Sequence, residues 1–287
     1  MPPTVVAAVL GSAVIHAGWN AAAKAIGNRL VASALMGAGY LIFGGLWCLV
    51  AVVPAAASWP YLITSVALQT GYLLLLTAAY AHGEFRQVYP LARGTAPVLV
   101  TAFSLGFLGE RLAVWQLVGI AFVVGSLAVL VGLPRRFARG KGSRAGLLLA
   151  VATGVVIATY SLVDGLGVRS SGSAAGYAAW LMMLQGPLLI AVCALLARPR
   201  QLVAWTRAGG VRTVLLGLAG GLASTVAYAI VLWAQDRASL AIVSTLRESS
   251  VLFAGVIGTL FFAERLSPRQ LMAAAGVVAG IALIQLG

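Results

Sequence analysis

Two stretches, "RGTAPVLVTAFSLGFLGERLAVWQL" (93–117) and "RESSVLFAGVIGTLFFAERLSPRQL" (247–271), are two copies of one pattern. The arginine that opens the first copy corresponds to the arginine that opens the second. The tripeptide Glu-Arg-Leu at 110–112 returns at 264–266, again 154 residues later. The match has no gaps, and it keeps charged and amide side chains within apolar surroundings. Both points argue against chance similarity between two apolar helices. The sequence therefore predicts an internal duplication.

The composition around these copies is that of a membrane protein. Of the 287 residues, 61% are hydrophobic and only 9% are charged, whereas soluble domains have about 45–50% apolar and about 25% charged residues. A membrane-spanning helix needs about 20 apolar residues. With short connectors, the chain has room for about ten such helices, and we expect an all-α integral membrane protein.

The apolar segments and their connectors predict ten transmembrane helices. Their approximate ranges are 3–23, 30–52, 60–81, 87–108, 112–132, 144–166, 174–196, 211–234, 239–262 and 267–286.

The duplication divides these helices into two repeats of five. We expect the first repeat at 1–133, a basic linker at 134–143 and the second repeat at 144–287. Because each repeat holds an odd number of helices, the two insert with opposite orientation. Inverted repeats of this kind are typical of secondary transporters, whose substrate site lies near the membrane midplane between the halves.

The basic residues predict how the chain is oriented. Fourteen Lys and Arg residues lie in the loops after the first, third, fifth, seventh and ninth helices, and three lie in the other loops. Loops rich in Lys and Arg stay in the cytoplasm. We therefore expect a multi-pass protein of the inner (plasma) membrane, with a cytoplasmic linker and both termini non-cytoplasmic. The net charge of +13 follows this pattern, so we expect no nucleic-acid partner.

Charged residues inside the predicted helices are candidates for a functional site. Arg93 lies early in the fourth helix, and Arg247 and Glu248 lie inside the ninth. A charge at mid-bilayer costs about 2.5–3.5 kcal/mol on insertion scales, so such residues usually face a cavity or a partner. Two interpretations stay open. The arginines bind a carboxylate-bearing substrate through their planar fork of donors, or they form a structural ion pair with Glu248.

A polar stripe marks the first helix, in "IHAGWNAAAK" (15–24). His16, Asn20 and Lys24 are four residues apart and share one helix face. We expect His16 and Asn20 to face an inner cavity with Trp19 beside them, and Lys24 to reach the membrane surface. His16 and Glu248 are candidate proton-coupling residues, although a lone buried histidine is more often a packing residue.

Further candidates are less specific. Tyr80 and Tyr228 are expected to line the cavity. Pro90 and Pro97 bracket Arg93 and are candidate hinge residues, because proline removes a backbone donor and kinks a helix. Glu110 and Glu264 end the fourth and ninth helices, where an acid opposes the helix dipole, so a nearby arginine or another helix end must compensate.

Taken in order, "HAGWNAAAK", "YPLARGTAP", "LGERL" and "TLRESS…FFAERL" resemble the EamA-type branch of the drug/metabolite transporter (DMT) superfamily. The resemblance covers the whole chain. It implies a ten-helix inverted-repeat carrier with a central cavity, similar to exporters of amino acids, metabolites or drugs that are often driven by proton exchange. It also implies that Asn20, Arg93 and Arg247 lie at that cavity.

The chain departs from that pattern in three ways. Tyr160 and Asp164 replace, in the second repeat, the Trp–Lys pattern of the first helix. Ser244 and Val251 stand where a symmetric second repeat would have the counterparts of Pro90 and Pro97. In addition, no acidic residue stands in the middle of the first helix, which argues against a simple proton–cation antiporter.

The expected function is secondary active transport, with export of small polar metabolites such as amino acids by alternating access. The alternative is an exporter or flippase of amphiphilic drugs or lipid-linked substrates. We expect no enzymatic activity, no metal and no cofactor, because the sequence has neither a metal-ligand cluster nor a Walker-type loop. The expected partners are a small-molecule substrate and the lipid bilayer. A proton is an open candidate for the coupling ion, and monomer and homodimer are both open.

Overall fold

The computed structural model describes residues 1–82, 85–131, 144–262 and 267–287. These residues form twelve α-helices, one short 3-10 helix (η1, Ala56–Ser58) and no strand. The helices are α1 (Pro3–Ile26), α2 (Arg29–Cys48), α3 (Trp59–His82), α4 (Phe85–Gly106), α5 (Val114–Val131), α6 (Arg144–Arg169), α7 (Ala174–Ala197), α8 (Pro199–Ala208), α9 (Gly210–Arg237), α10 (Leu240–Arg247), α11 (Ser250–Phe262) and α12 (Pro268–Leu286).

Helices lie at all ten segments that the sequence predicted, with two differences. The basic connector at 198–212 was expected to be a loop, but it contains the helix α8. Leu202 is buried there while Arg200 and Arg207 are exposed, so α8 is amphipathic. It has too few apolar residues to be recognised in the sequence as a helix. The second difference lies in the ninth segment, 239–262, which is broken into α10 and α11.

The break between α10 and α11 occurs without a proline. The amides of Glu248 and Ser249 bond to carbonyls three residues back, at Thr245 (3.0 Å) and Leu246 (3.1 Å). The Ser249 hydroxyl also donates to the Leu246 carbonyl at 2.7 Å. A serine side chain that bonds the preceding turn competes with the helical ladder and bends it. The tight turn therefore replaces one stretch of regular helix at a buried position.

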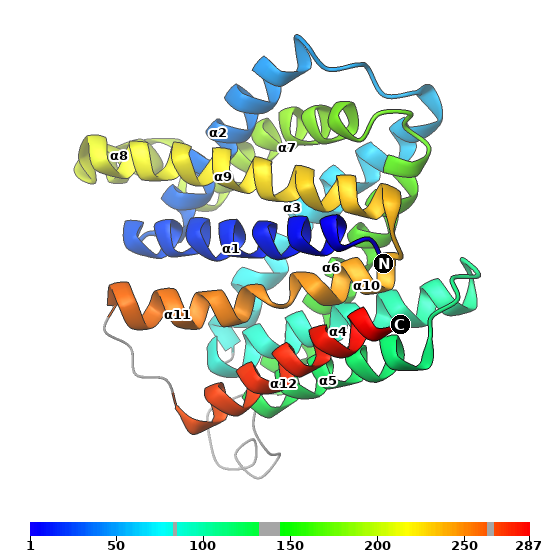
Figure 1. The fold of residues 1–287 in the computed structure, drawn as a ribbon. Helices are drawn as coiled ribbons and strands as arrows, with labels where there is room; N and C mark the ends of the chain where they lie inside the picture. Colours follow the sequence, from blue (N-terminus) through cyan, green and yellow to red (C-terminus); the bar gives the residue numbers. More distant parts are fainter. Residues whose placement is uncertain (83–84, 132–143, 263–266) are drawn as a thin grey trace.

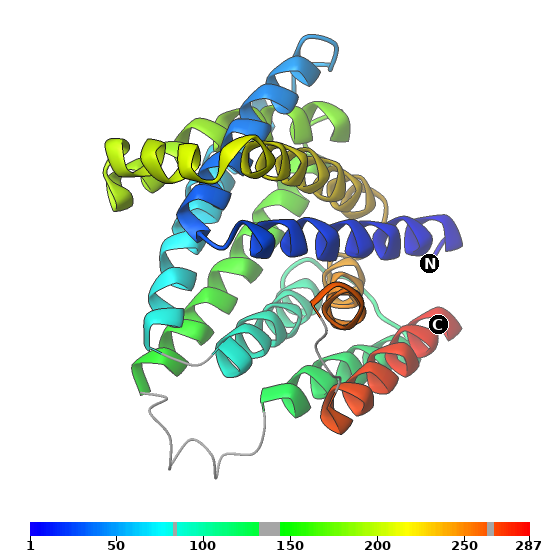
Figure 2. The same cartoon turned by 90° about the vertical axis from the view of Figure 1, so that its left-hand side faces the viewer.

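The helices pack in pairs (Figures 1 and 2). Helix α2 packs along α7, α5 along α12, α1 along α9, and α3 along α6. The contact between α5 and α12 is too close for a side chain at the crossing point. A Cβ added at Gly119 of α5 would lie 2.5 Å from the carbonyl oxygen of Gly280 in α12. In membranes, small residues allow this close approach of helix backbones.

The outer surface suits a lipid environment. Large apolar side chains such as Leu46, Val114, Leu148 and Leu195 are more than half exposed, which in water would form unusually extensive apolar patches. Within the described ranges, eight helical segments are long and apolar enough to cross a membrane, and Val114–Leu130 is a shorter apolar helix. The chain is therefore an all-helical, multi-pass membrane protein.

Candidate functional site

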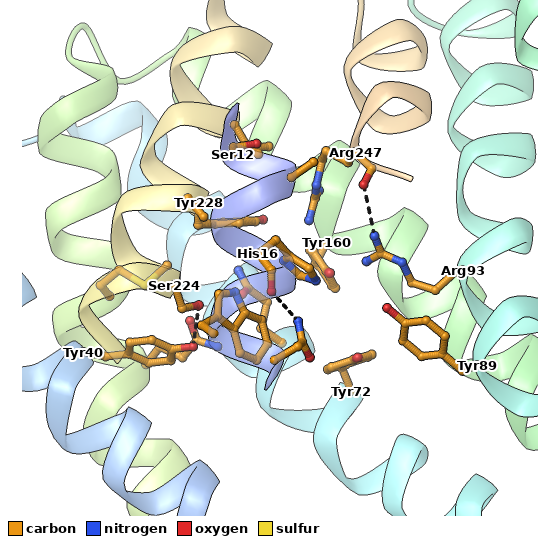
Figure 3. Close-up of a pocket in the computed structure, with 18 residues that line it drawn as sticks. Ser12, His16, Tyr40, Tyr72, Tyr89, Arg93, Tyr160, Ser224, Tyr228 and Arg247 are labelled. Atoms are coloured by element: carbon orange, nitrogen blue, oxygen red, sulfur yellow. Dashed lines mark hydrogen bonds between the residues drawn. The ribbon is translucent and has the colours of Figure 1, made fainter. Parts of the chain in front are cut away.

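A polar cavity lies among eight of the helices, α1, α2, α3, α4, α6, α7, α9 and α10, and its volume is about 140 Å³. Figure 3 shows the side chains that converge on it. They are Ser12, Ala13, His16, Trp19, Asn20, Tyr40, Gln69, Tyr72, Tyr89, Arg93, Tyr160, Met182, Gln185, Ser224, Ala227, Tyr228, Val231 and Arg247.

The first helix contributes its polar stripe to this cavity. His16, Trp19 and Asn20 all line it, at the positions where the sequence expected them. The rings of His16 and Trp19 meet edge to face at 4.8 Å, and the Asn20 amide donates to the His16 carbonyl at 2.8 Å. What these residues do for a substrate or a proton stays a prediction.

Two buried polar atoms at the cavity have no hydrogen-bond partner among the described residues. They are the indole nitrogen of Trp19, a donor, and the amide oxygen of Gln185, an acceptor. Leaving a buried donor or acceptor unsatisfied costs about 1–3 kcal/mol. The cavity therefore offers one donor and one acceptor that a bound solute or water can satisfy.

Arg93 is held in a buried ion pair. Its Nε donates to the Glu248 carboxylate at 2.9 Å, and Arg93 and Glu248 are only 6% and 3% exposed. A second nitrogen of the guanidinium donates to the Ser250 hydroxyl at 3.1 Å and to the Arg247 carbonyl at 3.4 Å. Of the two interpretations that the sequence left open, this geometry favours a structural ion pair for Arg93 and Glu248.

Arg247 is placed differently. It lines the cavity, its guanidinium lies 5.4 Å from the centre of the Tyr228 ring, and one nitrogen is 3.5 Å from the Ser161 hydroxyl. Within the described part of the chain it forms no ion pair. Arg247 is therefore the cation whose charge is available to an anionic group in the cavity.

Beside the cavity lies a buried carboxylate that was not among the site residues predicted from the sequence. Asp164 of α6 is fully buried. It accepts hydrogen bonds from the Tyr177 hydroxyl at 3.0 Å, from the Gln69 amide at 3.2 Å, and from the hydroxyls of Tyr228 and Ser65. A signal was present, since an aspartate well inside an apolar helix is rare and usually has a partner or a function.

A second charged cluster joins the ends of several helices. The Glu110 carboxylate accepts from the Leu240 amide at 3.0 Å and from the Ser239 hydroxyl at 2.7 Å, at the first turn of α10. Arg169 approaches the same carboxylate at 3.4 Å and donates to the Ala238 carbonyl at 2.8 Å. Glu110 thus meets another helix end, which was one of the two expected compensations, and an arginine that is Arg169 of α6 rather than the neighbouring Arg111. Glu264 lies outside the described residues.

The remaining candidates lie away from the cavity. Tyr80 is not among the lining residues, and the Arg29 guanidinium lies 4.3 Å from the centre of its ring. Pro90 and Pro97 are inside α4, which continues through both as helix. Their role as hinges stays a prediction.

The cavity also contains residues that were not predicted from the sequence to lie there. Four are aromatic or hydroxyl side chains that carry no charge and so gave no signal against the apolar background: Tyr40, Tyr89, Tyr160 and Ser224. Across the described ranges, no group of three His, Cys, Asp or Glu side chains could hold a metal ion.

The site and fold define a polytopic membrane protein with a central polar cavity, and the comparisons with known proteins agree. Residues 144–286 match the EamA-like transporter family. The chain therefore belongs to this family, the EamA-type transporters of the DMT superfamily.

One solved structure, described only as "Crystal structure of protein", superposes with a TM-score of 0.76. The two chains are 19% identical, and the match covers 100% of this chain and 98% of the other. At this identity the likeness concerns the fold alone. No curated protein sequence matches the chain significantly.

Proposed function

We propose that the protein is a secondary transporter that exports small carboxylate-bearing metabolites, such as amino acids, by alternating access. The observation that carries the proposal is Arg247, an arginine with no ion-pair partner in the described ranges, at a polar cavity among eight helices. A guanidinium binds a carboxylate through paired, charge-assisted hydrogen bonds. The unpartnered donor of Trp19 and acceptor of Gln185 give the site further polar groups that can fix a solute's orientation.

The packing of the helices supports two inverted repeats of five. If α1 to α5 are matched in order with α6, α7, α9, α10–α11 and α12, the contact of α1 with α9 becomes that of α6 with α3. Both contacts exist. Likewise, α4 against α6 becomes α10–α11 against α1, and α11 does pack on α1. A pseudo-twofold relation of this kind is typical of carriers that expose a midplane site to each side in turn.

The placement of the termini supports the proposed orientation. Both termini lie at one end of the molecule, while α8 and the C-terminal end of α1 lie at the other (Figure 1). Lys24 and the arginines of α8 are therefore at the end opposite the termini. Since basic loops stay in the cytoplasm, we propose non-cytoplasmic termini in the plasma membrane. A C-terminal reporter that is active only outside the cytoplasm is the expected result, and cytoplasmic activity would overturn this orientation.

The size of the cavity favours a small substrate over the amphiphilic alternative. Pockets for drug-sized ligands measure about 300–1,000 Å³, and this cavity measures about 140 Å³. A larger hollow of about 680 Å³ exists, but it is lined almost entirely by apolar side chains such as Phe43, Trp47 and Leu222. A surface of that kind suits lipid chains in the bilayer and offers a carboxylate no charged group.

Counterflow in proteoliposomes tests the proposed function. Purified protein is loaded with a pool of unlabelled amino acids and small carboxylates, and the uptake of each labelled solute is measured separately. We expect exchange of at least one carboxylate-bearing solute. If folded protein exchanges none of them, the proposed substrate class is wrong, and amphiphilic or lipid-linked substrates become the better hypothesis.

The role of Arg247 is tested in the same assay. A charge-assisted hydrogen bond contributes about 1.5–3 kcal/mol, so Arg247→Ala should weaken the apparent affinity about 10- to 150-fold. Arg237→Ala is the matched control, because Arg237 lies at the end of α9, stacks on Trp233 and is outside the cavity. Equal affinity in wild type and Arg247→Ala would refute the carboxylate-binding role.

A further inference from the structure

Asp164 and the side chains that hydrogen-bond to it form a buried polar network. Its carboxylate has no cation as a direct partner among the described residues. The carboxylate has no exposed surface, and none of the ion pairs among the described residues includes it. Its four donors, Ser65, Gln69, Tyr177 and Tyr228, are all uncharged. Burying a carboxylate ion without a paired cation costs free energy that neutral hydrogen bonds offset only in part. A bound proton removes that cost.

The elements around α6 bring few charges to this region. The helix is packed by α3, α4, α7, α9, α10 and η1. Together with Tyr160 of α6 itself, the ionisable side chains that they place near Asp164 or the adjoining cavity are Tyr61, Tyr72, Tyr89, Arg93, Tyr177, Tyr228 and Arg247, and α1 adds His16 at the cavity. The η1 segment, Ala56–Ser58, has none. Because Arg93 is bound by Glu248, the cation left to respond to Asp164 is Arg247.

Tyr228 connects Asp164 to that cation and to the cavity. Its hydroxyl donates to Asp164 Oδ2, its ring lies under the Arg247 guanidinium, and it lines the cavity. Arg247 also reaches α6 directly, at Ser161, one turn from Asp164. Figure 3 shows the side chains of Tyr228 and Arg247 extending toward one another from different helices. A change in the protonation of Asp164 can therefore affect the Arg247 guanidinium through the Tyr228 side chain alone.

We propose that Asp164 is a proton-binding site, and that a proton at Asp164 and a substrate carboxylate at Arg247 bind together. The second part rests on the proposed transport function. When a proton binds Oδ2, the carboxylate becomes a neutral acid whose new O–H donates to the Tyr228 oxygen. The tyrosine then changes from donor to acceptor in that bond, and its own O–H turns toward the cavity.

The two binding events support each other for two reasons. Protonation removes a negative charge that repels an incoming carboxylate, and it gives that carboxylate the Tyr228 O–H as a donor beside Arg247. By thermodynamic reciprocity, a bound carboxylate favours protonation of Asp164 to the same degree. Occupancy of either site by its own ligand thus raises the affinity of the other site.

Infrared difference spectroscopy tests the proton site without any substrate. Wild-type protein in lipid bilayers is moved from alkaline to acidic buffer, and the carbonyl stretch of protonated carboxylic acids is recorded. We expect a band that Asp164→Asn removes and that Tyr228→Phe shifts, because the phenylalanine cannot bond the acid. Asp236→Asn should keep the band, since Asp236 is exposed and bound by Arg237. A spectrum that is the same in wild type and Asp164→Asn would overturn the proposal.

Exchange of the labelled amino-acid pool tests the coupling. At a low solute concentration, wild-type exchange should be at least about fivefold faster in acid than in alkaline buffer, as for a typical coupling between sites. Asp164→Asn, which carries no charge at any pH, should lose this dependence, while Asp236→Asn should keep it. An Asp164→Asn protein with the wild-type pH dependence would refute the coupling. If wild type exchanges nothing, the transport proposal and the coupling both fail, and the infrared band alone decides the proton site.

Discussion

Helix α4 and the broken helix α10–α11 are the two copies of one sequence pattern, yet each uses its arginine differently. Arg93 in α4 is bound by a carboxylate and a hydroxyl of the other copy. Arg247, its counterpart, faces the cavity without an ion-pair partner among the residues that the structure describes. The difference arises because Glu248 has no acidic counterpart in the first copy, where Gly94 occupies the matching position. One duplicated arginine thus joins the halves and the other is left for the site.

The two copies also interrupt their helices by different means. Helix α4 contains Pro90 and Pro97 and continues as a helix through both. Its counterpart has serine and valine at those positions and breaks instead at Glu248 and Ser249. Loss of a helical hydrogen bond near the arginine is therefore common to both copies, although only the second shows a break. A duplicated pattern can keep the position of a feature while changing the residue that produces it.

The largest expected effect is a difference in the free energy of unfolding between the Arg93→Ala and Arg247→Ala variants. Removing one partner of a buried ion pair costs about 3–5 kcal/mol, so Arg93→Ala should lower the free energy of unfolding by about that amount. Arg247→Ala should lower it by less than about 1 kcal/mol, because no carboxylate is left without a partner. Unfolding of both variants in mixed micelles measures the difference. Equal losses would mean that Arg247 is as structural as Arg93.

A smaller effect is expected at the joint between the copies. Glu110 caps the first turn of α10 and receives Arg169, and caps and helix-dipole contacts contribute about 1–2 kcal/mol. Glu110→Gln should lower the free energy of unfolding by about 1 kcal/mol. Asp236→Asn, which removes an exposed ion pair at the C-terminal end of α9, should cost well under about 1 kcal/mol. A loss at Glu110 no larger than at Asp236 would show that the joint contributes little.

The smallest effect is expected from the proline of α4. Pro97→Ala restores an amide that can bond the Arg93 carbonyl, but it also removes packed ring atoms, so the free energy of unfolding should change by less than about 1 kcal/mol. If Pro97 serves as a hinge, the exchange rate should fall even though stability is unchanged. Unchanged exchange would leave the second copy's break as the better hinge candidate.

The sequence predicted the helices well because twenty-residue apolar segments between short connectors have few alternative structures. It also predicted that Asn20, Trp19, His16 and Tyr228 face a common cavity, since a polar stripe on an apolar helix must turn inward. It could not predict which arginine would be paired. That choice depends on side chains that meet across 155 residues of chain, and helical periodicity carries no information about such contacts.

Other features were hidden for different reasons. The break at Glu248 and Ser249 has no proline or glycine to mark it. Tyr80 was expected at the cavity, but its ring packs under Arg29, a pairing between side chains of different helices. Asp164 was visible as an aspartate in an apolar helix, and only the four donors around it distinguish it as a site.

The ion pair between Arg93 and Glu248 also sets an order for assembly. The two residues are 155 positions apart, and ribosomes add about 5–20 residues per second. Helix α4 is therefore made roughly 8–30 s before its carboxylate partner emerges. During that interval Arg93 has no Glu248 to pair with, and its side chain must reach toward the lipid headgroups. Once α10 and Glu248 have been synthesised, Arg93 can form its ion pair. The contact between α4 and the turn after α10 therefore forms late in the synthesis of the chain.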